Sequence, residues 1–385
     1  MLESTVTSEH CDNTAARRPA VACRSVLMVG TDLDGMGGVR AVVRGYVDGG
    51  LFERYRCMYV VTHRAGSAWV KTVTALRAWV KVAIYLRRLD APLVHVQTAS
   101  RASFWRKSVV CLMARWAGRP YLLHVHGGEF MQFYERESGP LTQRFIRNIF
   151  GHAALVIALS DEWRDRLLRI CPTAPVEVLH NAVALPNTTG LRRLEDREPT
   201  LLFLGNLGKG KGTYDLLRAF ARIAPLFPRL KLICGGVGSL DEVRQLATQL
   251  DISDRVICPG WLNPERKSAE LASGTIFILP SYAEGMPMAL LEAMSWRLPV
   301  IATPVGGIPQ VIQHDVNGLL VAPGDIDGLA TNITRLMKDP ATRERLGTAA
   351  RATIESGFSL EEALDHLSRI YRHFGLEARA AGESA

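Results

Sequence analysis

The stretch LFLGNLGKGKGTYDLL (residues 202–217) nearly matches the pattern of a phosphate-binding loop between a strand and a helix. Gly205, Gly210 and Lys211 satisfy the pattern G-x-x-x-x-G-K, but Gly212 stands where a P-loop has the Ser or Thr that binds Mg²⁺. The stretch is therefore a damaged P-loop, an ordinary strand-turn-helix, or a glycine-rich lysine loop that serves another kind of phosphate. The sequence on either side of it separates these three interpretations.

Strand-like and helical patterns alternate on both sides of this loop. Residues 69–89, 214–224 and 241–250 are expected to be helical. The strand-like runs are RSVLMVG, YRCMYVVT, PLVHVQT, RPYLLHVHG and ALVIALS before residue 179, and TLLFLGN, RLKLICGG, RVICPGW, TIFILPS and PVIATP after residue 199. Strands separated by helices indicate parallel, doubly wound sheets, whose ligand sites lie at the carboxyl ends of the strands. We therefore predict an α/β fold with two doubly wound, Rossmann-like domains.

The loss of this pattern between residues 179 and 199 divides the chain. We predict a disordered polar tail at 1–23, a first domain at 24–185, a linker at 186–199, a second domain at 200–358, a closing helix at 359–376 and a tail at 377–385. Ser359 and Glu362 form a capping box at the start of the closing helix. Its single apolar stripe consists of Leu360, Leu364, Leu367, Tyr371 and Phe374.

The composition is that of a soluble globular protein. The 385 residues are 48% hydrophobic and 22% charged, which suits roughly two domains with cores of their own. No uncharged run of about 18 apolar residues occurs, so we expect no segment to span a membrane. The seven cysteines are scattered without a C-x-x-C pair, which indicates reduced thiols in the cytoplasm and no metal site.

The net charge of +8 is concentrated in residues 64–119, which hold eleven Lys or Arg and one acid. No nucleic-acid-binding motif accompanies this segment, so we expect no nucleic-acid partner. Basic residues interleaved with tryptophan on helices favour an anionic membrane surface. A lipid-diphosphate acceptor would explain the same charge, and solvated helix faces are the third interpretation. We expect at least half of the segment's four tryptophans to lie in the core: Trp69, Trp79, Trp105 and Trp116.

The run ILPSYAEGMPMALLEAMSWRLPVIATPVGGIP (residues 278–309) carries two carboxylates at a strand-to-helix junction. Glu284 falls in the loop, Pro287 suits the first helical position, and Glu292 lies within the helix. Free N–H groups at the helix start favour an anionic group, and nearby carboxylates suit the hydroxyls of a ribose or a sugar. The alternative is a pair of solvated glutamates, against which their position after a strand argues.

The spacing of Glu284 and Glu292 resembles the E-x7-E signature of the family 4 retaining glycosyltransferases, which have the GT-B fold. RLPVIATPVGGIPQVI and NGLLVAPGD continue the likeness, and FLGNLGKGKGTYDLLRAF resembles the family's G-R-L-x-x-x-K-G opening of the second domain. MGG (36–38) and HVHGGEF (124–130) match its glycine and histidine loops, and SFWRKS with HVHGGEF is most similar to bacterial exopolysaccharide enzymes. The resemblance implies an acceptor-side and a nucleotide-sugar-binding domain facing a central cleft, with the closing helix crossing back to the first domain.

The resemblance also implies roles for the loop residues. Lys211 would contact the donor diphosphate, where a fixed cation stabilises the charge that grows as the nucleotide leaves. Gly37 and Gly38 would let the backbone approach the same diphosphate without a Cβ clash. Asn206 stands where the family has the Arg of G-R-L, so it can hydrogen-bond the diphosphate but brings no charge. Diphosphate binding is then expected to depend on Lys211, with help from Lys209.

The remaining implied roles concern the sugar and the ribose. Glu284 would hold the donor sugar hydroxyls beside the backbone amides of Gly285 and Met286. Glu292 would accept hydrogen bonds from the nucleotide ribose. The family retains the anomeric configuration of the sugar and needs no metal, so we expect neither a metal nor a cofactor.

The histidine loop offers two candidates for the residue beside the transferred sugar. We take strand alternation to place His124 and His126 on opposite faces of the sheet, so that only one of them points into the cleft. We assign that position to His126 because Gly127 and Gly128 open space beside it. The alternative is a hydrogen-bonded structural histidine at the end of a strand.

We therefore predict a cytoplasmic glycosyltransferase, peripheral on the inner face of the membrane, that moves a hexose from a nucleotide-sugar to a polyprenyl-diphosphate-linked glycan in exopolysaccharide synthesis. GDP-mannose is the favoured donor by resemblance, UDP-sugars are the alternative, and CPGW (258–261) is a candidate edge of the base pocket. The rival functions are a GT-B-fold epimerase or phosphorylase, a P-loop NTPase, and a non-catalytic nucleotide-sugar-binding module. Gly212 argues against the NTPase because it cannot hold Mg²⁺.

Overall fold

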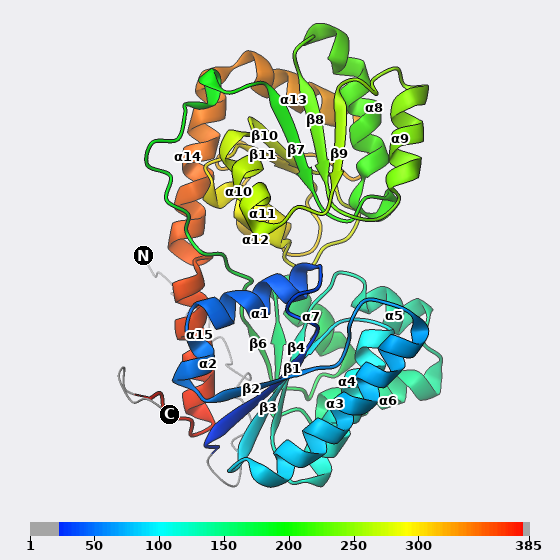
Figure 1. Ribbon diagram of the computed structural model, residues 1–385, viewed down its shortest axis with the longest axis vertical. Coiled ribbons are helices and arrows are strands. Elements are labelled where there is room, and N and C mark those ends of the chain that lie inside the picture. Colours follow the sequence, from blue (N-terminus) through cyan, green and yellow to red (C-terminus); the bar gives the residue numbers. More distant parts are fainter. Residues whose placement is uncertain (1–22, 380–385) are drawn as a thin grey trace, which may run out of the picture.

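The computed structural model describes residues 23–379, which form two stacked α/β lobes (Figure 1). The predicted tails fall almost entirely on residues 1–22 and 380–385, which lie outside the described part of the chain. Cys23 is buried, and its N–H donates to Phe374 O at 2.8 Å. The described chain therefore begins against the end of its last helix.

The lower lobe in Figure 1 contains a parallel sheet in the order β2-β1-β3-β4-β5-β6. Helices cover both faces, so the central strands are buried along their length and are mainly apolar. The strands are β1 (Ser25–Gly30), β2 (Cys57–Val61), β3 (Pro92–Thr98), β4 (Tyr121–Val125), β5 (Leu155–Ala158) and β6 (Val176–Val178). The helices are α1 (Gly38–Asp48), α2 (Leu51–Arg54), α3 (Ala68–Arg88), α4 (Ala102–Trp116), α5 (Phe130–Arg136), α6 (Pro140–Gly151) and α7 (Asp161–Ile170).

The upper lobe repeats this architecture with a parallel sheet in the order β12-β11-β10-β7-β8-β9. Its strands are β7 (Thr200–Leu204), β8 (Lys231–Gly235), β9 (Val256–Gly260), β10 (Ile276–Leu279), β11 (Val300–Ala302) and β12 (Leu319–Leu320). Its helices are α8 (Thr213–Ile223), α9 (Leu240–Gln249), α10 (Pro264–Ser273), α11 (Met288–Ser295), α12 (Ile308–Val311), α13 (Ile326–Lys338) and α14 (Pro340–Gly357). The prediction of two doubly wound domains is confirmed.

The last helix, α15 (Leu360–His373), leaves the upper lobe and packs against the lower one, as predicted (Figure 1). Ser359 Oγ accepts a hydrogen bond from Glu362 N at 3.3 Å and so caps the helix. The apolar stripe of α15 shares one buried cluster with β1 and α1, to which these residues contribute: Val26, Met28, Val42, Tyr46, Leu364, Leu367, Ile370, Tyr371 and Phe374. The helix therefore belongs to the core of the first lobe.

The chain passes between the lobes twice, and the two passages are hydrogen-bonded to each other. Val183 N donates to Phe358 O at 3.0 Å, and Leu360 N donates to Val183 O at 2.9 Å. Both covalent connections between the lobes therefore meet at one point beside the start of α15.

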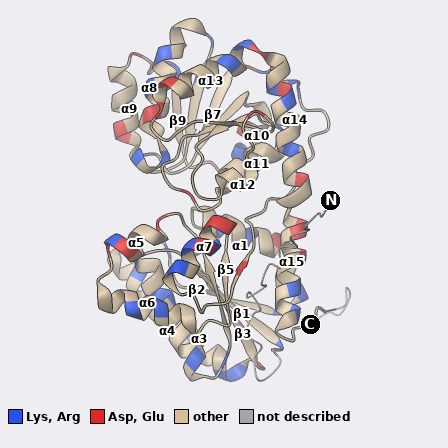
Figure 2. Cartoon of the chain, turned by 180° about the vertical axis from the view of Figure 1, so that it is seen from behind, with Lys and Arg blue, Asp and Glu red and all other residues tan. Residues whose placement is uncertain are grey.

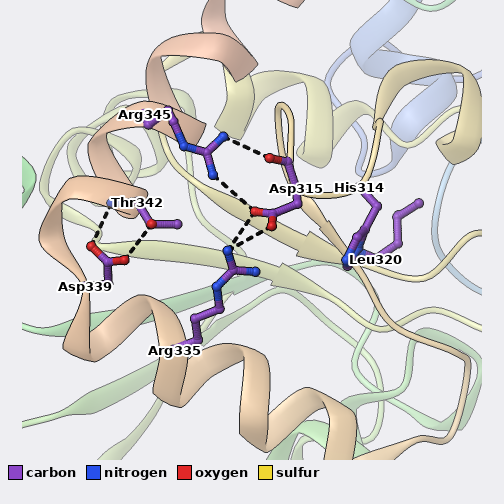
Figure 3. Close-up of polar contacts among 7 residues, drawn as sticks. All are labelled: His314, Asp315, Leu320, Arg335, Asp339, Thr342 and Arg345. Atoms are coloured by element: carbon purple, nitrogen blue, oxygen red, sulfur yellow. Dashed lines mark hydrogen bonds and ion pairs between the residues drawn. The ribbon is translucent and has the colours of Figure 1, made fainter.

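An ion-paired cluster fixes the corner between α13 and α14 (Figure 3). Arg335 Nη2 donates to both carboxylate oxygens of Asp315 at 2.9 Å, and Arg345 Nη2 donates to one of them at 3.1 Å. These hydrogen bonds, that of Arg335 first, hold the pKa of Asp315 below its ordinary value. Asp339 caps α14 by accepting from Thr342 N at 2.9 Å. The cluster thereby joins the loop before β12 to both helices.

The expectation for the tryptophans of the basic segment is wrong. Trp69, Trp105 and Trp116 are 75%, 43% and 82% exposed. Trp79 packs against the core of the first lobe, and its Nε1 donates to Arg106 O at 3.1 Å. Tryptophan is highly buried on average, but three of these four rings lie on the outside of α3 and α4.

Candidate active site between the two lobes

The glycine-rich loop that follows β7 is locked to the loop that follows β10. Tyr282 N donates to Gly210 O at 3.0 Å, which joins the two loops at the carboxyl end of the sheet. Gly212 has φ 68°, and a Cβ built there would lie 2.0 Å from Pro280 O. A residue with a side chain cannot occupy this position without moving one of the loops. Glycine at position 212 is thus required by the close approach of the loops, and the stretch is a glycine-rich lysine loop.

Lys211 and Glu284 form an ion pair across these two loops. Lys211 Nζ lies 2.6 Å from Glu284 Oε1, and Ser281 Oγ donates to the same oxygen at 2.7 Å. The side chain of Glu284 is 7% exposed, whereas that of Lys211 is 30% exposed. The carboxylate is therefore fixed by two donors, and the lysine reaches it from the partly open side.

The loop that carries Glu284 is also held by the first lobe. Trp163 Nε1 donates to Glu284 O at 3.3 Å, and Asn181 Nδ2 donates to Met286 O at 2.7 Å. A Cβ on Gly128 would lie 2.6 Å from the carbonyl carbon of Glu284, so the histidine loop and the Glu284 loop touch backbone to backbone. The histidine loop of the first lobe thus touches the Glu284 loop of the second lobe directly.

Glu292 lies within α11, as predicted, although Pro287 is the cap of this helix and Met288 its first residue. The carboxylate accepts from Lys267 Nζ of α10 at 2.6 Å and is 18% exposed. Sequence reasoning did not find Lys267, because it lies on a different helix and outside every recognised motif. The two glutamates of the signature thus each hold a lysine.

His126 ends a buried chain of polar groups that reaches the crossover helix. Its Nε2 lies 2.6 Å from Gln97 Oε1, and Gln97 Nε2 lies 3.1 Å from His95 Nε2. His95 Nδ1 lies 2.8 Å from the hydroxyl of Tyr371 on α15. Since an amide oxygen accepts and an amide nitrogen donates, His126 carries its proton on Nε2 and His95 carries its proton on Nδ1. Burial lowers the pKa of both imidazoles to about 3, so both are neutral near pH 7.

The expectation that His124 and His126 point to opposite faces is wrong. Their ring centroids lie 4.2 Å apart and the rings stack, because residues two apart in a strand share a face. His124 is fully buried between His95 and His126, and burial lowers its pKa well below the ordinary value. His126, which follows the last residue of β4, lies nearer the loops that meet the second lobe.

The remaining predicted residues lie on open parts of the loops. Gly37 has φ 118° and caps α1, and no described atom lies within 4 Å of a Cβ built on Gly37 or Gly38. Asn206 and Lys209 are exposed. Space is thus available beside the backbone at the start of α1, although no contact assigns Asn206 a partner there.

Several residues of the site have weak sequence signals. Ser281 stands three residues before Glu284 within the quoted run, and Gln97 stands two residues after His95 at the end of a strand, so both could be found from their positions. Trp163 and Asn181 have no such signal, since only the packing of the two lobes brings them to the Glu284 loop.

Among residues 23–379, no group of three His, Cys, Asp or Glu side chains could hold a metal ion. No helix within the same range is long and apolar enough to cross a membrane.

Solved structures share this two-lobed arrangement. Sucrose-phosphate synthase from Thermosynechococcus elongatus superposes with a TM-score of 0.73 at 20% identity, over 93% of this chain and 99% of that one. The Anabaena protein HepE in complex with UDP-glucose superposes with a TM-score of 0.72 at 19% identity, over 90% and 99% of the two chains. At these identities the likeness shows the fold, which is the GT-B arrangement of two facing doubly wound domains.

Family models and curated relatives define the family. Residues 192–353 match the model of glycosyl transferases group 1, and residues 23–182 match that of the glycosyl transferase 4-like domain. The protein therefore belongs to the glycosyltransferases of family 4 type. It is 28% identical to the alpha-D-kanosaminyltransferase of Streptomyces kanamyceticus, over 69% of this chain and 73% of that one. It is 29% identical to the amylovoran biosynthesis glycosyltransferase AmsK of Erwinia amylovora, but it spans only 57% of that relative's length.

Proposed function

We propose that this glycosyltransferase moves a hexose from a nucleotide-sugar to a polyprenyl-diphosphate-linked glycan, with retention of configuration and without a metal. The observation that supports this most directly is the Lys211–Glu284 pair at 2.6 Å, because it places a cation and a carboxylate at one point between the lobes. A lysine can bind a phosphate as a point charge, and a carboxylate accepts from sugar hydroxyls. The two side chains thus suit the two ends of one donor molecule.

Donor binding would rearrange this pair. The diphosphate takes Lys211, Glu284 keeps its bond from Ser281, and its freed acceptor positions bind hydroxyls of the donor sugar. Glu292 would bind the ribose hydroxyls, and His126 would lie by the transferred sugar with its unprotonated Nδ1 as an acceptor. In the transfer, the acceptor hydroxyl oxygen bonds to the anomeric carbon as the bond from that carbon to the diphosphate breaks. The hydroxyl proton leaves with the diphosphate, whose charge Lys211 stabilises.

The acceptor would be reached at a membrane surface through the first lobe. Figure 2 shows basic residues along α3, α4 and α6 of this lobe. The outer face of α3 exposes Lys71, Arg77 and Lys81 beside an apolar row of Trp69, Leu76, Val80 and Ile84. Basic and apolar residues on one exposed helix face favour binding to anionic lipid. This arrangement supports a peripheral location on the inner face of the cytoplasmic membrane, and the relation to AmsK supports a role in exopolysaccharide synthesis.

A thermal-shift screen of nucleotide-sugars tests the donor, because a ligand that binds the native state raises its melting temperature. We expect GDP-mannose to give the largest shift, with UDP-sugars as the alternative class because HepE binds UDP-glucose. The hit is then incubated with lipid-linked acceptors, and products are identified by mass spectrometry with and without EDTA. Transfer that persists in EDTA is expected. Release of an altered nucleotide-sugar without acceptor would indicate an epimerase, and binding without turnover would indicate a binding module.

A further inference from the structure

Two adjacent cations on α4 lack a carboxylate partner within residues 23–379. Lys107 is 3% exposed, and its Nζ donates to Ser103 Oγ at 2.8 Å. Arg106 Nε is buried without a hydrogen-bond partner. No acidic side chain of the described chain acts on either group. Burial alone lowers the pKa of Arg106, and burial followed by the charge of Arg106 lowers that of Lys107. The sequence motif SFWRKS therefore contains two basic groups that no carboxylate of the described chain pairs with.

The direction of these side chains places them toward the interlobe end of the first sheet. α4 begins just after the carboxyl end of β3, and Lys107 reaches back by one turn to Ser103 near the helix start. The charge of Lys107 lowers the pKa of His126, and the charges of Arg106, Lys107 and Lys71 lower the pKa of His63. We call Lys71, Arg106 and Lys107, together with His63, the α4 basic cluster. It adjoins the histidine that the proposed function places by the sugar.

The acid that acts on His63 of the cluster is already engaged. Asp32 acts on His63, but its carboxylate is paired with Arg64 Nε at 3.1 Å. A buried cation without a partner is costly, and an anionic ligand that replaces the lost water removes that cost. A phosphoryl group suits the pair best, because arginine binds it with a planar set of donors and lysine adds a compact charge.

We propose that the α4 basic cluster binds a phosphoryl group of the sugar acceptor. This inference rests on the proposed function, in which Lys211 of the second lobe binds the donor diphosphate, so a second anion site on the first lobe serves the other substrate. The acceptor phosphate would enter beside His126 and orient the acceptor hydroxyl toward the donor sugar. A lipid-linked diphosphate and a soluble sugar phosphate offer the same group, and the test separates them.

The direct test measures proton uptake on anion binding. Burial lowers the pKa of Lys107 from its ordinary value to about 7, so at pH 8 the amine is mostly neutral and must gain a proton when a phosphate approaches. Pyrophosphate is titrated into the full chain by calorimetry at pH 8, in two buffers of different ionisation enthalpy and with saturating nucleoside diphosphate to occupy the donor site. We expect binding for the wild type with more proton uptake than for Lys107→Met, because the proton balance of the anion itself is common to both, and binding at least tenfold weaker for Lys107→Met.

Matched variants separate this inference from folding and from the donor site. Lys231→Met removes the same charge from an exposed position on the second lobe and should change nothing. Lys107→Met replaces a buried amine, which has no carboxylate partner and donates to Ser103 Oγ, by an apolar chain of similar length, so its melting temperature should not fall. Arg106→Gln should also weaken pyrophosphate binding. Equal affinity in wild type and Lys107→Met, or the same loss in Lys231→Met, would overturn the proposal.

The transfer assay identifies the acceptor class. With a diphosphate-linked glycan, Lys107→Met and Arg106→Gln should raise the acceptor KM at least tenfold and leave the donor KM unchanged. Three acceptors distinguish recognition of the lipid from recognition of the phosphate. They are the full-length polyprenyl acceptor in vesicles, a short-chain diphosphate acceptor in solution, and the same glycan without phosphate. A raised donor KM would assign the cluster to the donor and refute the inference. If the wild type transfers no sugar, the proposed function fails, and the calorimetric arm still decides whether the cluster binds a phosphoryl group.

Discussion

Replacing Gly212 by alanine perturbs the junction of the two loops of the second lobe at a single atom. The residue has φ 68° and ψ 20°, in the left-handed region, and its Cβ would lie 2.0 Å from Pro280 O. The left-handed conformation costs a non-glycine residue about 1–2 kcal/mol. Relief of the overlap by moving packed backbone costs about 1–3 kcal/mol more. We therefore expect Gly212→Ala to destabilise the second lobe by about 2–5 kcal/mol.

Differential scanning calorimetry measures this loss. For a domain of this size, each kcal/mol lowers the melting temperature by about 2–4 °C, so the transition of the second lobe should fall by about 4–20 °C. Because the loop that moves carries Lys211, nucleotide-sugars should also stabilise the variant less than the wild type. The stabilisation is read from the shift in melting temperature at saturating ligand.

The control is Gly210→Ala in the same loop. Gly210 lies in a short helical turn with no left-handed φ, and no described atom lies within 4 Å of its Cβ. Its melting temperature should stay near that of the wild type. A Gly212→Ala protein that melts within about 1 °C of the wild type, or equal losses in the two variants, would show that the approach to Pro280 does not constrain the loop.

Three further predictions concern binding and pH. Glu292→Gln should weaken nucleotide-sugar binding by about tenfold or more in calorimetry, because a hydrogen bond to a charged group contributes about 1.5–3 kcal/mol. Unchanged affinity would contradict the assignment of Glu292 to the ribose. His95 and His126 have pKa values lowered from 6.5 to about 3, so the unfolded chain binds more protons in that window. The stabilisation is therefore fully present above pH 6.5 and is lost as the pH falls toward 3, by up to about 1.4 kcal/mol per pH unit for each histidine. Urea midpoints that stay constant from pH 7 to pH 4 would contradict the burial of these two histidines as neutral groups. Binding to anionic vesicles in a sedimentation assay should fall as salt rises, because exposed charges are screened within about 8 Å at physiological ionic strength. Salt-independent binding would argue against the basic face of α3.

The sequence predicts the architecture well because both lobes depend on local patterns. Apolar strands alternate with amphipathic helices, and the stripe of α15 from Leu360 to Phe374 matches the buried face that the structure shows. The sequence also predicts that the loops of Lys211 and Glu284 lie at the same end of the sheet, because each of them follows a strand. The sequence does not predict the direct ion pair between Lys211 and Glu284, because this pair depends on the register of β7 against β10.

Failures of prediction arise where distant elements meet or where two environments give the same pattern. Lys267 reaches Glu292 from another helix, and Tyr371 reaches His95 from the far end of the chain, so neither contact leaves a mark in local sequence. The sequence does not distinguish the exposed Trp69 and Trp116 from buried tryptophans, and only the packing of α3 and α4 shows that they face outward. His124 differs from these cases, because the period of two in a strand is itself enough to place it on the same face as His126.

The crossing of α15 also sets the order in which the two lobes can be completed during synthesis. The strands of the first lobe leave the ribosome early, yet the side of its core formed by Met28 and Tyr46 is closed only by Leu367 and Phe374, near the end of the chain. That apolar surface stays open while the whole second lobe is being made. The second lobe has its last strand and α14 before α15 emerges, so the domain that is translated first is the domain that is finished last.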